Sequence, residues 1–267
     1  MPKRHSARFL LFPLSLLPLS ACSAPRIDLM PHLGRMEFGG TVAADTSGLT
    51  LTSNDVRDDL GLTETSSEVG GRADLSFGGS VVTLSYSPAS FSGNGTLSGQ
   101  LTKDGVTLPV GTNVASKIQL DVGSLVWTHD LIPGDTVELG LGLGAHVIDF
   151  QSTLTSTDVG TPGSIDLSET LPVPVVAVRA GLEFGAFDVS ALGSGIKANY
   201  NGDDATFYDV DLMGRWRFLG SSDGHLCGAV FVGWRKTAVQ LDYTDGTDHT
   251  EADIHVSGLY YGLGLGF

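Results

Sequence analysis

The residues best suited to acid–base chemistry are two aspartates and two histidines near the C-terminus, together with one isolated histidine. A histidine beside a carboxylate can act as a general base, so Asp248, His249, Asp253 and His255 form a candidate cluster, with His146 as a further candidate. The sequence has no Gly-x-Ser-x-Gly segment of the kind that carries a serine nucleophile. Polar residues in loops form such pairs by chance. We therefore assign no catalytic residue. The alternative function is a hydrolase that acts on lipid or peptide through a site at the rim of the fold, and His146 is expected to face inward near that rim.

Charged residues are suited to a second kind of chemistry, ion pairing, because many of them recur at every second position. Asp209, Asp211, Arg215 and Arg217 share one face of an extended chain, and the positions between them are largely apolar. Alternation with a period of two is typical of a strand that has one polar and one apolar face. These charges are therefore expected to be held by β-strands.

Period two recurs along most of the chain, and no segment has a sustained helical period. Short connections such as 78–79 alternate with long polar ones such as 92–115. The pattern predicts ten strands, over 35–45, 67–78, 80–91, 116–128, 135–150, 171–184, 186–199, 205–218, 225–241 and 252–267.

Short turns at one end and long polar loops at the other are typical of transmembrane β-barrels. Each predicted strand is long enough to cross a bilayer at a tilt, which takes about 9–11 residues. We therefore predict an all-β fold, an antiparallel up-and-down transmembrane barrel over 35–267 with ten strands. Eight strands are the alternative if 186–199 is misassigned, and a lipid-anchored β-sandwich is the alternative fold.

The interior of such a barrel holds the faces opposite the apolar ones. By this parity seven bases and seven acids point inward. Charges in a confined space are costly unless they are paired, so equal numbers predict a network of ion pairs that closes the lumen. A narrow channel for a small polar solute is the alternative, because glycines such as Gly140 and Gly142 leave space on the same face. The predicted network comprises Arg35, Glu37, Arg72, Asp74, Lys117, Asp121, Glu138, Arg179, Glu183, Asp209, Asp211, Arg215, Arg217 and Arg235.

The composition argues against several functions. Acidic residues outnumber basic ones 30 to 15, whereas a protein that binds nucleic acid needs a basic surface. The 36 glycines follow no Gly-x-y period, which excludes collagen. Cysteine and histidine spacings match no zinc site, and the acidic segment 55–59 lacks the spacing of a calcium-binding loop. We predict no cofactor and no metal site, with Ca²⁺ or Mg²⁺ at the acidic loops as alternative partners.

The N-terminus has the features of a targeting segment. Basic residues precede an apolar run over 9–19, which is too short to span a membrane as a helix. The next residues, Leu19-Ser20-Ala21-Cys22, resemble a bacterial lipobox. This resemblance implies a signal peptide over 1–21, a lipidated Cys22 and a linker over 22–34. An ordinary signal peptide, in which Cys22 has no role, is the alternative.

The C-terminus alternates up to its last residue, an aromatic one. Tyr261, Leu263, Leu265 and Phe267 share one face, which resembles the signal that outer-membrane barrels present to the barrel-assembly machinery. Over 35–267 the chain resembles small outer-membrane barrels of Gram-negative bacteria. The resemblance implies a place in the cell outer membrane, contact with its lipid and lipopolysaccharide, and assembly and lipoprotein-sorting machineries as partners. It also implies an aromatic girdle near the short turns, formed by Phe77, Trp127, Phe184, Phe187, Trp216, Phe218 and Phe267. The expected function is that of an integral barrel with a structural or narrow-channel role.

Overall fold

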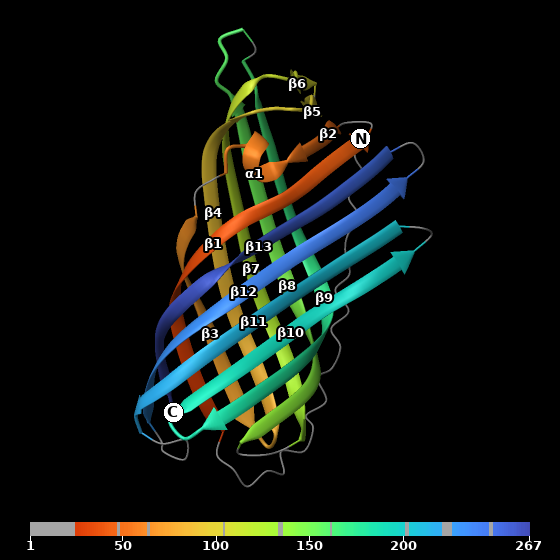
Figure 1. Ribbon diagram of the computed structural model, residues 1–267. Coiled ribbons are helices and arrows are strands. Elements are labelled where there is room, and N and C mark those ends of the chain that lie inside the picture. Colours follow the sequence, from red (N-terminus) through yellow and green to blue (C-terminus); the bar gives the residue numbers. More distant parts are fainter. Residues whose placement is uncertain are drawn as a thin grey trace, which may run out of the picture.

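Ten long strands form a closed antiparallel barrel in the computed structural model (Figure 1). The residues that the structure describes are 25–46, 49–62, 65–103, 105–132, 136–160, 162–200, 203–220, 226–245 and 248–267. The all-β, ten-stranded fold predicted from the sequence is confirmed. No helix within the described ranges is long and apolar enough to cross a membrane.

Each barrel strand pairs with the next barrel strand along the chain, and the first pairs with the last, so the wall has no outer edge strands. Pairs such as Leu33 with Tyr261 join β1 to β13. The barrel strands are β1 (Arg26–Thr46), β3 (Ser66–Phe77), β4 (Ser80–Thr96), β7 (Asn113–Ile132), β8 (Val137–Ser156), β9 (Ser164–Phe184), β10 (Phe187–Tyr200), β11 (Asp203–Leu219), β12 (Cys227–Asp245) and β13 (Asp248–Gly266).

The two ends of the barrel differ. At the lower end in Figure 1, which we call the turn end, two of the connections are two-residue turns, Gly78-Gly79 and Gly185-Ala186, and both residues of the first have positive φ. Glycine adopts this conformation without steric cost. At the upper end, the loop end, lie four short elements: β2 (Leu49–Asp55), α1 (Val56–Asp59), β5 (Leu101–Lys103) and β6 (Val106–Leu108).

β1 begins at Arg26, so residues 26–34 belong to the wall rather than to the linker that the sequence predicted over 22–34. Pro31 lies within this stretch. The β1–β13 ladder skips Met30 and Pro31, whereas the β1–β3 ladder runs through both. Proline has no N–H to donate. At Pro31 the pairing of β1 with β13 is interrupted, whereas its pairing with β3 continues.

In the half of the barrel next to the turn end, the lower half, the outer surface is apolar and the inner surface is polar. Large side chains such as Leu263 and Val176 are 62% and 63% exposed on the outside, whereas Asp211 and Arg217 are buried inside. Six of the seven predicted girdle aromatics are also largely exposed here: Trp127, Phe184, Phe187, Trp216, Phe218 and Phe267. A continuous apolar exterior of this size is unstable in water.

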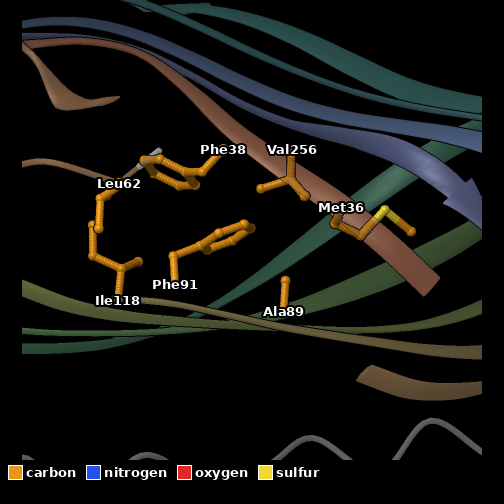
Figure 2. Packing of buried hydrophobic residues seen from close by; sticks show 7 residues of the cluster. All are labelled: Met36, Phe38, Leu62, Ala89, Phe91, Ile118 and Val256. Carbon is orange, nitrogen blue, oxygen red and sulfur yellow. The ribbon is translucent and has the colours of Figure 1, made fainter. Parts of the chain in front are cut away.

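The half next to the loop end, the upper half, has the reverse polarity. Figure 2 shows a buried apolar cluster inside the barrel, in which the rings of Phe38 and Phe91 lie 5.4 Å apart and Leu62 packs beside them. A second cluster, which includes Leu101 and Leu108 of β5 and β6, fills the space below these short strands. Side chains on the outer surface of this half are mostly polar and exposed.

The segment around α1 covers the upper part of the wall between β3 and β4. The β3–β4 ladder ends at Gly71 and Tyr86, and β4 continues above it. There the backbone of the α1 segment lies against β4 so closely that a Cβ at Gly93 would sit 2.0 Å from the carbonyl oxygen of Gly61. Glycine at these positions allows the contact and brings Leu62 into the apolar cluster.

Candidate functional site

The charged interior of the lower half is the candidate site. Ten of the fourteen side chains predicted to face the lumen do so: Arg72, Asp74, Glu138, Arg179, Glu183, Asp209, Asp211, Arg215, Arg217 and Arg235. The parity of the strands therefore identified most of the network.

Four predicted members of the network face outward instead. Arg35, Glu37, Lys117 and Asp121 lie on the outer surface, and the apolar residues between them, such as Met36 and Ile118, point inside. All four lie above the apolar belt, where the polarity of the two faces is reversed. The rule that the polar face is the inner face holds only where the exterior is apolar.

Three inward carboxylates were missed by the sequence analysis: Asp28, Asp130 and Asp188. Asp28 lies in the segment that was assigned to the linker, although Ile27, Asp28 and Leu29 already alternate in polarity. Asp130 belongs to the part of β7 beyond the predicted strand end. Asp188 alternates with apolar Phe187 and Val189 in β10, and this signal was available from the sequence.

The layer of charges nearest the turn end is built around three arginines. Nε of Arg215 lies 2.9 Å from the carboxylate of Asp188, and Nη2 of Arg217 lies 2.6 Å from that of Glu183. Arg179 contacts the carboxylates of both Asp130 and Glu138. These side chains line a polar cavity of about 340 Å³.

The next layer connects strands on different sides of the barrel. Arg72 on β3 lies 3.0 Å from Asp74 on the same strand and 3.1 Å from Asp211 on β11. The hydroxyl of Tyr260 on β13 donates to Asp211, and Thr83 on β4 donates to Asp74 over 2.7 Å. One set of contacts therefore spans the lumen from β4 to β11.

Arg235 forms the third layer. Its Nε lies 2.8 Å from Asp209 on the adjacent strand, and its Nη1 donates to Ser87 of β4, on the far side of the lumen, over 2.5 Å. Thr237 also donates to Asp209, over 2.6 Å. The cavities beside this layer measure about 10 and 20 Å³, and a cavity of roughly 10–15 Å³ holds one water molecule.

His146 does not lie at the rim as predicted. It is 1% exposed, deep inside the barrel, because β8 continues for ten residues above it to Ser156. Its Nε2 is 2.9 Å from the hydroxyl of Ser194, its ring packs on Phe207, and its Nδ1 has no hydrogen-bond partner within the described parts of the chain. A histidine and a serine are thus in contact, but no carboxylate orients the imidazole as in a catalytic triad.

The predicted histidine–aspartate cluster near the C-terminus lies only partly within the described residues. His255 and Asp253 point to the outer surface of β13, where Gln240 donates to Asp253 over 3.2 Å. His146 faces the interior and is remote from both. The side chains of Asp248 and His249 lie outside the described residues, as does Cys22. Within the described ranges, no group of three His, Cys, Asp or Glu side chains is arranged to hold a metal ion.

Comparison with solved structures identifies the architecture. The chain aligns with the outer-membrane protease OmpT from Escherichia coli at a TM-score of 0.55 and 11% identity, covering 95% of this chain and 99% of that one. The fold is that of a bacterial outer-membrane β-barrel. A Pseudomonas aeruginosa FadL homologue aligns at a TM-score of 0.34, with 10% identity over 91% of this chain and 90% of that one. The β domain of the Bordetella autotransporter BrkA aligns at 0.31, with 12% identity over 92% of this chain and 99% of that one. No family model and no curated protein matches the sequence.

Proposed function

We propose that the protein is an integral outer-membrane barrel with a structural role, and that its lumen is closed by paired charges. The barrel holds the polar upper half and the short elements of the loop end outside the membrane. The observation that carries the proposal is the contact of Arg235 with Asp209 on one side of the lumen and Ser87 on the other. A single side chain bridges the interior where a pore would have to run.

Electrostatics favours a closed interior. An ion crossing the lower half would have to separate Arg72 from Asp211 and Arg235 from Asp209, and these four side chains are largely buried. Separating a buried ion pair costs roughly 3–5 kcal/mol because it leaves a charge without compensation. The apolar cluster of the upper half, which includes Phe38 and Phe91, is a second barrier because it excludes hydrated ions. Wide outer-membrane channels instead have polar, water-filled interiors.

The similarity to a protease supports the fold and carries no activity to this chain, because one fold hosts many functions. A hydrolase at the rim was the alternative expected from the sequence. Within the described residues His146 is buried below the rim, and His255 points away from the interior. A structural barrel therefore has more support than an enzyme.

The partners follow from this function and remain part of the proposal. They are the lipid and lipopolysaccharide of the outer membrane, the barrel-assembly machinery acting on the C-terminal strand, and the lipoprotein-sorting machinery if Cys22 is lipidated. Tyr261, Leu263 and Leu265 lie on the outer face of β13, and Phe267, which follows the strand, is also exposed, so an assembly factor can reach all four. Divalent cations that bridge the acidic loops to lipopolysaccharide phosphates are a further proposed contact.

Two measurements test the proposal. A closed barrel in detergent should migrate faster on a gel before boiling than after it, because its first strand pairs with its last and no strand is left with a whole edge unpaired. In planar bilayers the unmodified protein should give no stable conductance steps, with a water-filled porin as the positive control. A variant with Arg35→Ala and Glu37→Ala, which changes only charges on the outer surface, should behave like the unmodified protein. Large and stable steps from the unmodified protein would overturn the closed lumen, and identical mobility before and after boiling would overturn the barrel in the membrane.

A further inference from the structure

The wall between β9 and β10 is open in its upper part. The ladder that joins these strands ends at the pair Val176 and Gly195. Above this pair β9 continues through 164–175 with β8 as its partner, and β10 continues from Ile196 with β11 as its partner. The other shortened seam, between β3 and β4, is covered by the α1 segment. Lys103 of β5 donates from its Nζ to the backbone carbonyl oxygen of Asp166 near the upper end of β9. Below that contact, no described segment covers the seam between β9 and β10.

Side-chain exposure shows the same opening. Leu171 and Ile196 have the parity of inward-facing residues, yet they are 48% and 37% exposed. Their neighbours across the ladders, Ile148 and Phe207, are buried. Apolar residues that face the interior are therefore accessible from outside at this one seam of the described wall.

Two prolines lie on β9 where it separates from β10. The β8–β9 ladder runs past Pro172 and Pro174, so the N–H groups that these residues lack are those that would have pointed toward β10. An open edge in hydrocarbon is costly because its backbone groups find no partner. The prolines remove two donors at the place where the edge becomes free, which suits contact with lipid.

A groove of about 440 Å³ follows the opening on the outer surface. Its walls include Val176, Val178 and the glycines 193 and 195, and Lys197 stands at its upper end. Val176 lies eight residues above the girdle residue Phe184, which corresponds to roughly 20 Å of height at about 3.3 Å per residue and a tilt of about 40°. The apolar band of such barrels is about 25 Å tall, so a groove about 20 Å above the girdle at the turn end lies in the outer leaflet.

We propose that this groove binds one lipid of the outer leaflet, with an acyl chain along Val176, Val178 and Gly193 and the phosphate of the headgroup against Lys197. The inference depends on the proposed insertion in the membrane and goes beyond it. Apolar walls match an acyl chain, and the cation stands where headgroups lie. Within the described residues no carboxylate pairs with Lys197. Gly193 contributes space, because a Cβ placed there meets no atom within 4 Å.

Native mass spectrometry of the full-length protein in detergent tests this site. Phosphatidylglycerol and phosphatidylcholine with identical acyl chains are the two probes. The unmodified protein should retain one phosphatidylglycerol and prefer it to phosphatidylcholine by roughly threefold to fivefold, as expected for one exposed ion pair. The Lys197→Gln variant should lose this preference. The Gly193→Phe variant should lose the bound lipid of either kind, because the ring fills the groove.

Matched controls separate the groove from the rest of the surface. Gly214 also faces outward on β11 with open space at its Cβ, and Lys117 is also an exposed outward lysine, on β7. Gly214→Phe and Lys117→Gln should bind lipid like the unmodified protein. Gel mobility before and after boiling is measured for every variant, so a failure to form the barrel is distinguished from a failure to bind lipid. Lipid binding that is insensitive to both Lys197→Gln and Gly193→Phe would overturn the site. So would a stable dimer that Gly193→Phe disrupts, because the open edge would then pair with a second copy.

Discussion

The lower half of the barrel has a charged interior inside an apolar wall, whereas the upper half has an apolar interior inside a polar wall. The same strands form both halves: β1 contributes Asp28 to the charged interior and Phe38 to the apolar cluster. The alternation of the backbone does not change along β1. What changes is the environment on the outside, and the residue types on the two faces exchange accordingly.

A barrel strand is therefore specified by its two environments rather than by one polar and one apolar face. In the lower half, polar groups inside must satisfy one another, so the identity and geometry of each side chain matter. In the upper half, water outside satisfies the polar groups, and the interior is held by packing. The two halves should therefore respond differently to substitutions of similar size.

The largest effect is expected in the lower half from Arg235→Met, which keeps much of the side-chain volume and removes the charge. Asp209 would then be a buried carboxylate without its partner. Breaking such a pair costs roughly 3–5 kcal/mol in the free energy of unfolding. Urea-induced unfolding in detergent micelles measures this loss. The double variant Arg235→Met with Asp209→Leu should recover most of it, and a double variant as unstable as the single one would contradict the explanation.

A smaller effect is expected where the upper half depends on backbone contact. Gly93→Ala places a methyl group against the carbonyl oxygen of Gly61, at 2.0 Å in the present geometry. The α1 segment must move away from β4, and forced packing of this kind costs roughly 1–3 kcal/mol. The segment should become sensitive to protease while the barrel stays heat-modifiable. Gly160→Ala, in the connection between β8 and β9 where an added Cβ meets no atom within 4 Å, is the control, and equal protease sensitivity of both variants would contradict the specific contact.

A still smaller effect is expected from Ile118→Leu in the apolar cluster of the upper half. Ile118 is 2% exposed and packs near Phe91. Exchanging two apolar side chains of equal volume usually costs less than about 1.5 kcal/mol, because the neighbours repack. Urea unfolding should therefore show a much smaller shift than for Arg235→Met. A loss as large as that of Arg235→Met would mean that the two halves do not differ in tolerance.

The sequence was sufficient to predict the fold class, the number of barrel strands and the inward direction of ten charges, because period two is a local property of the chain. It was insufficient where the environment outside the barrel changes. Arg35, Glu37, Lys117 and Asp121 follow the same alternation as Arg217, and nothing local reveals that the outer surface beside them is polar rather than apolar.

Contacts across the lumen could not be predicted either. Arg235 and Ser87 are 148 positions apart, and they meet because of how far the strands are displaced along one another when the barrel closes. His146 lies far below the rim because β8 extends to Ser156, six residues beyond the predicted strand end at 150. The early end of the β9–β10 ladder was visible only indirectly, in the two prolines of 171–175.

The smallest effect is expected at the loop end, from titration of Asp158. The side-chain amide and the backbone N–H of Asn113 both donate to its carboxylate over 2.9 Å, and they lower its pKa below the ordinary value of 3.8. A carboxyl group whose pKa is lowered by folding stabilises the folded form above the pKa of the unfolded chain, and this contribution is lost as the pH falls through the folded pKa. Because Asp158 is exposed, water screens most of the interaction. Protection of the Asn113 amide from hydrogen exchange should therefore decrease slightly on acidification below about pH 4, while the amides of the lower half do not change. In Asp158→Asn this step should be absent, and a step of the same size in that variant would show that another group is responsible.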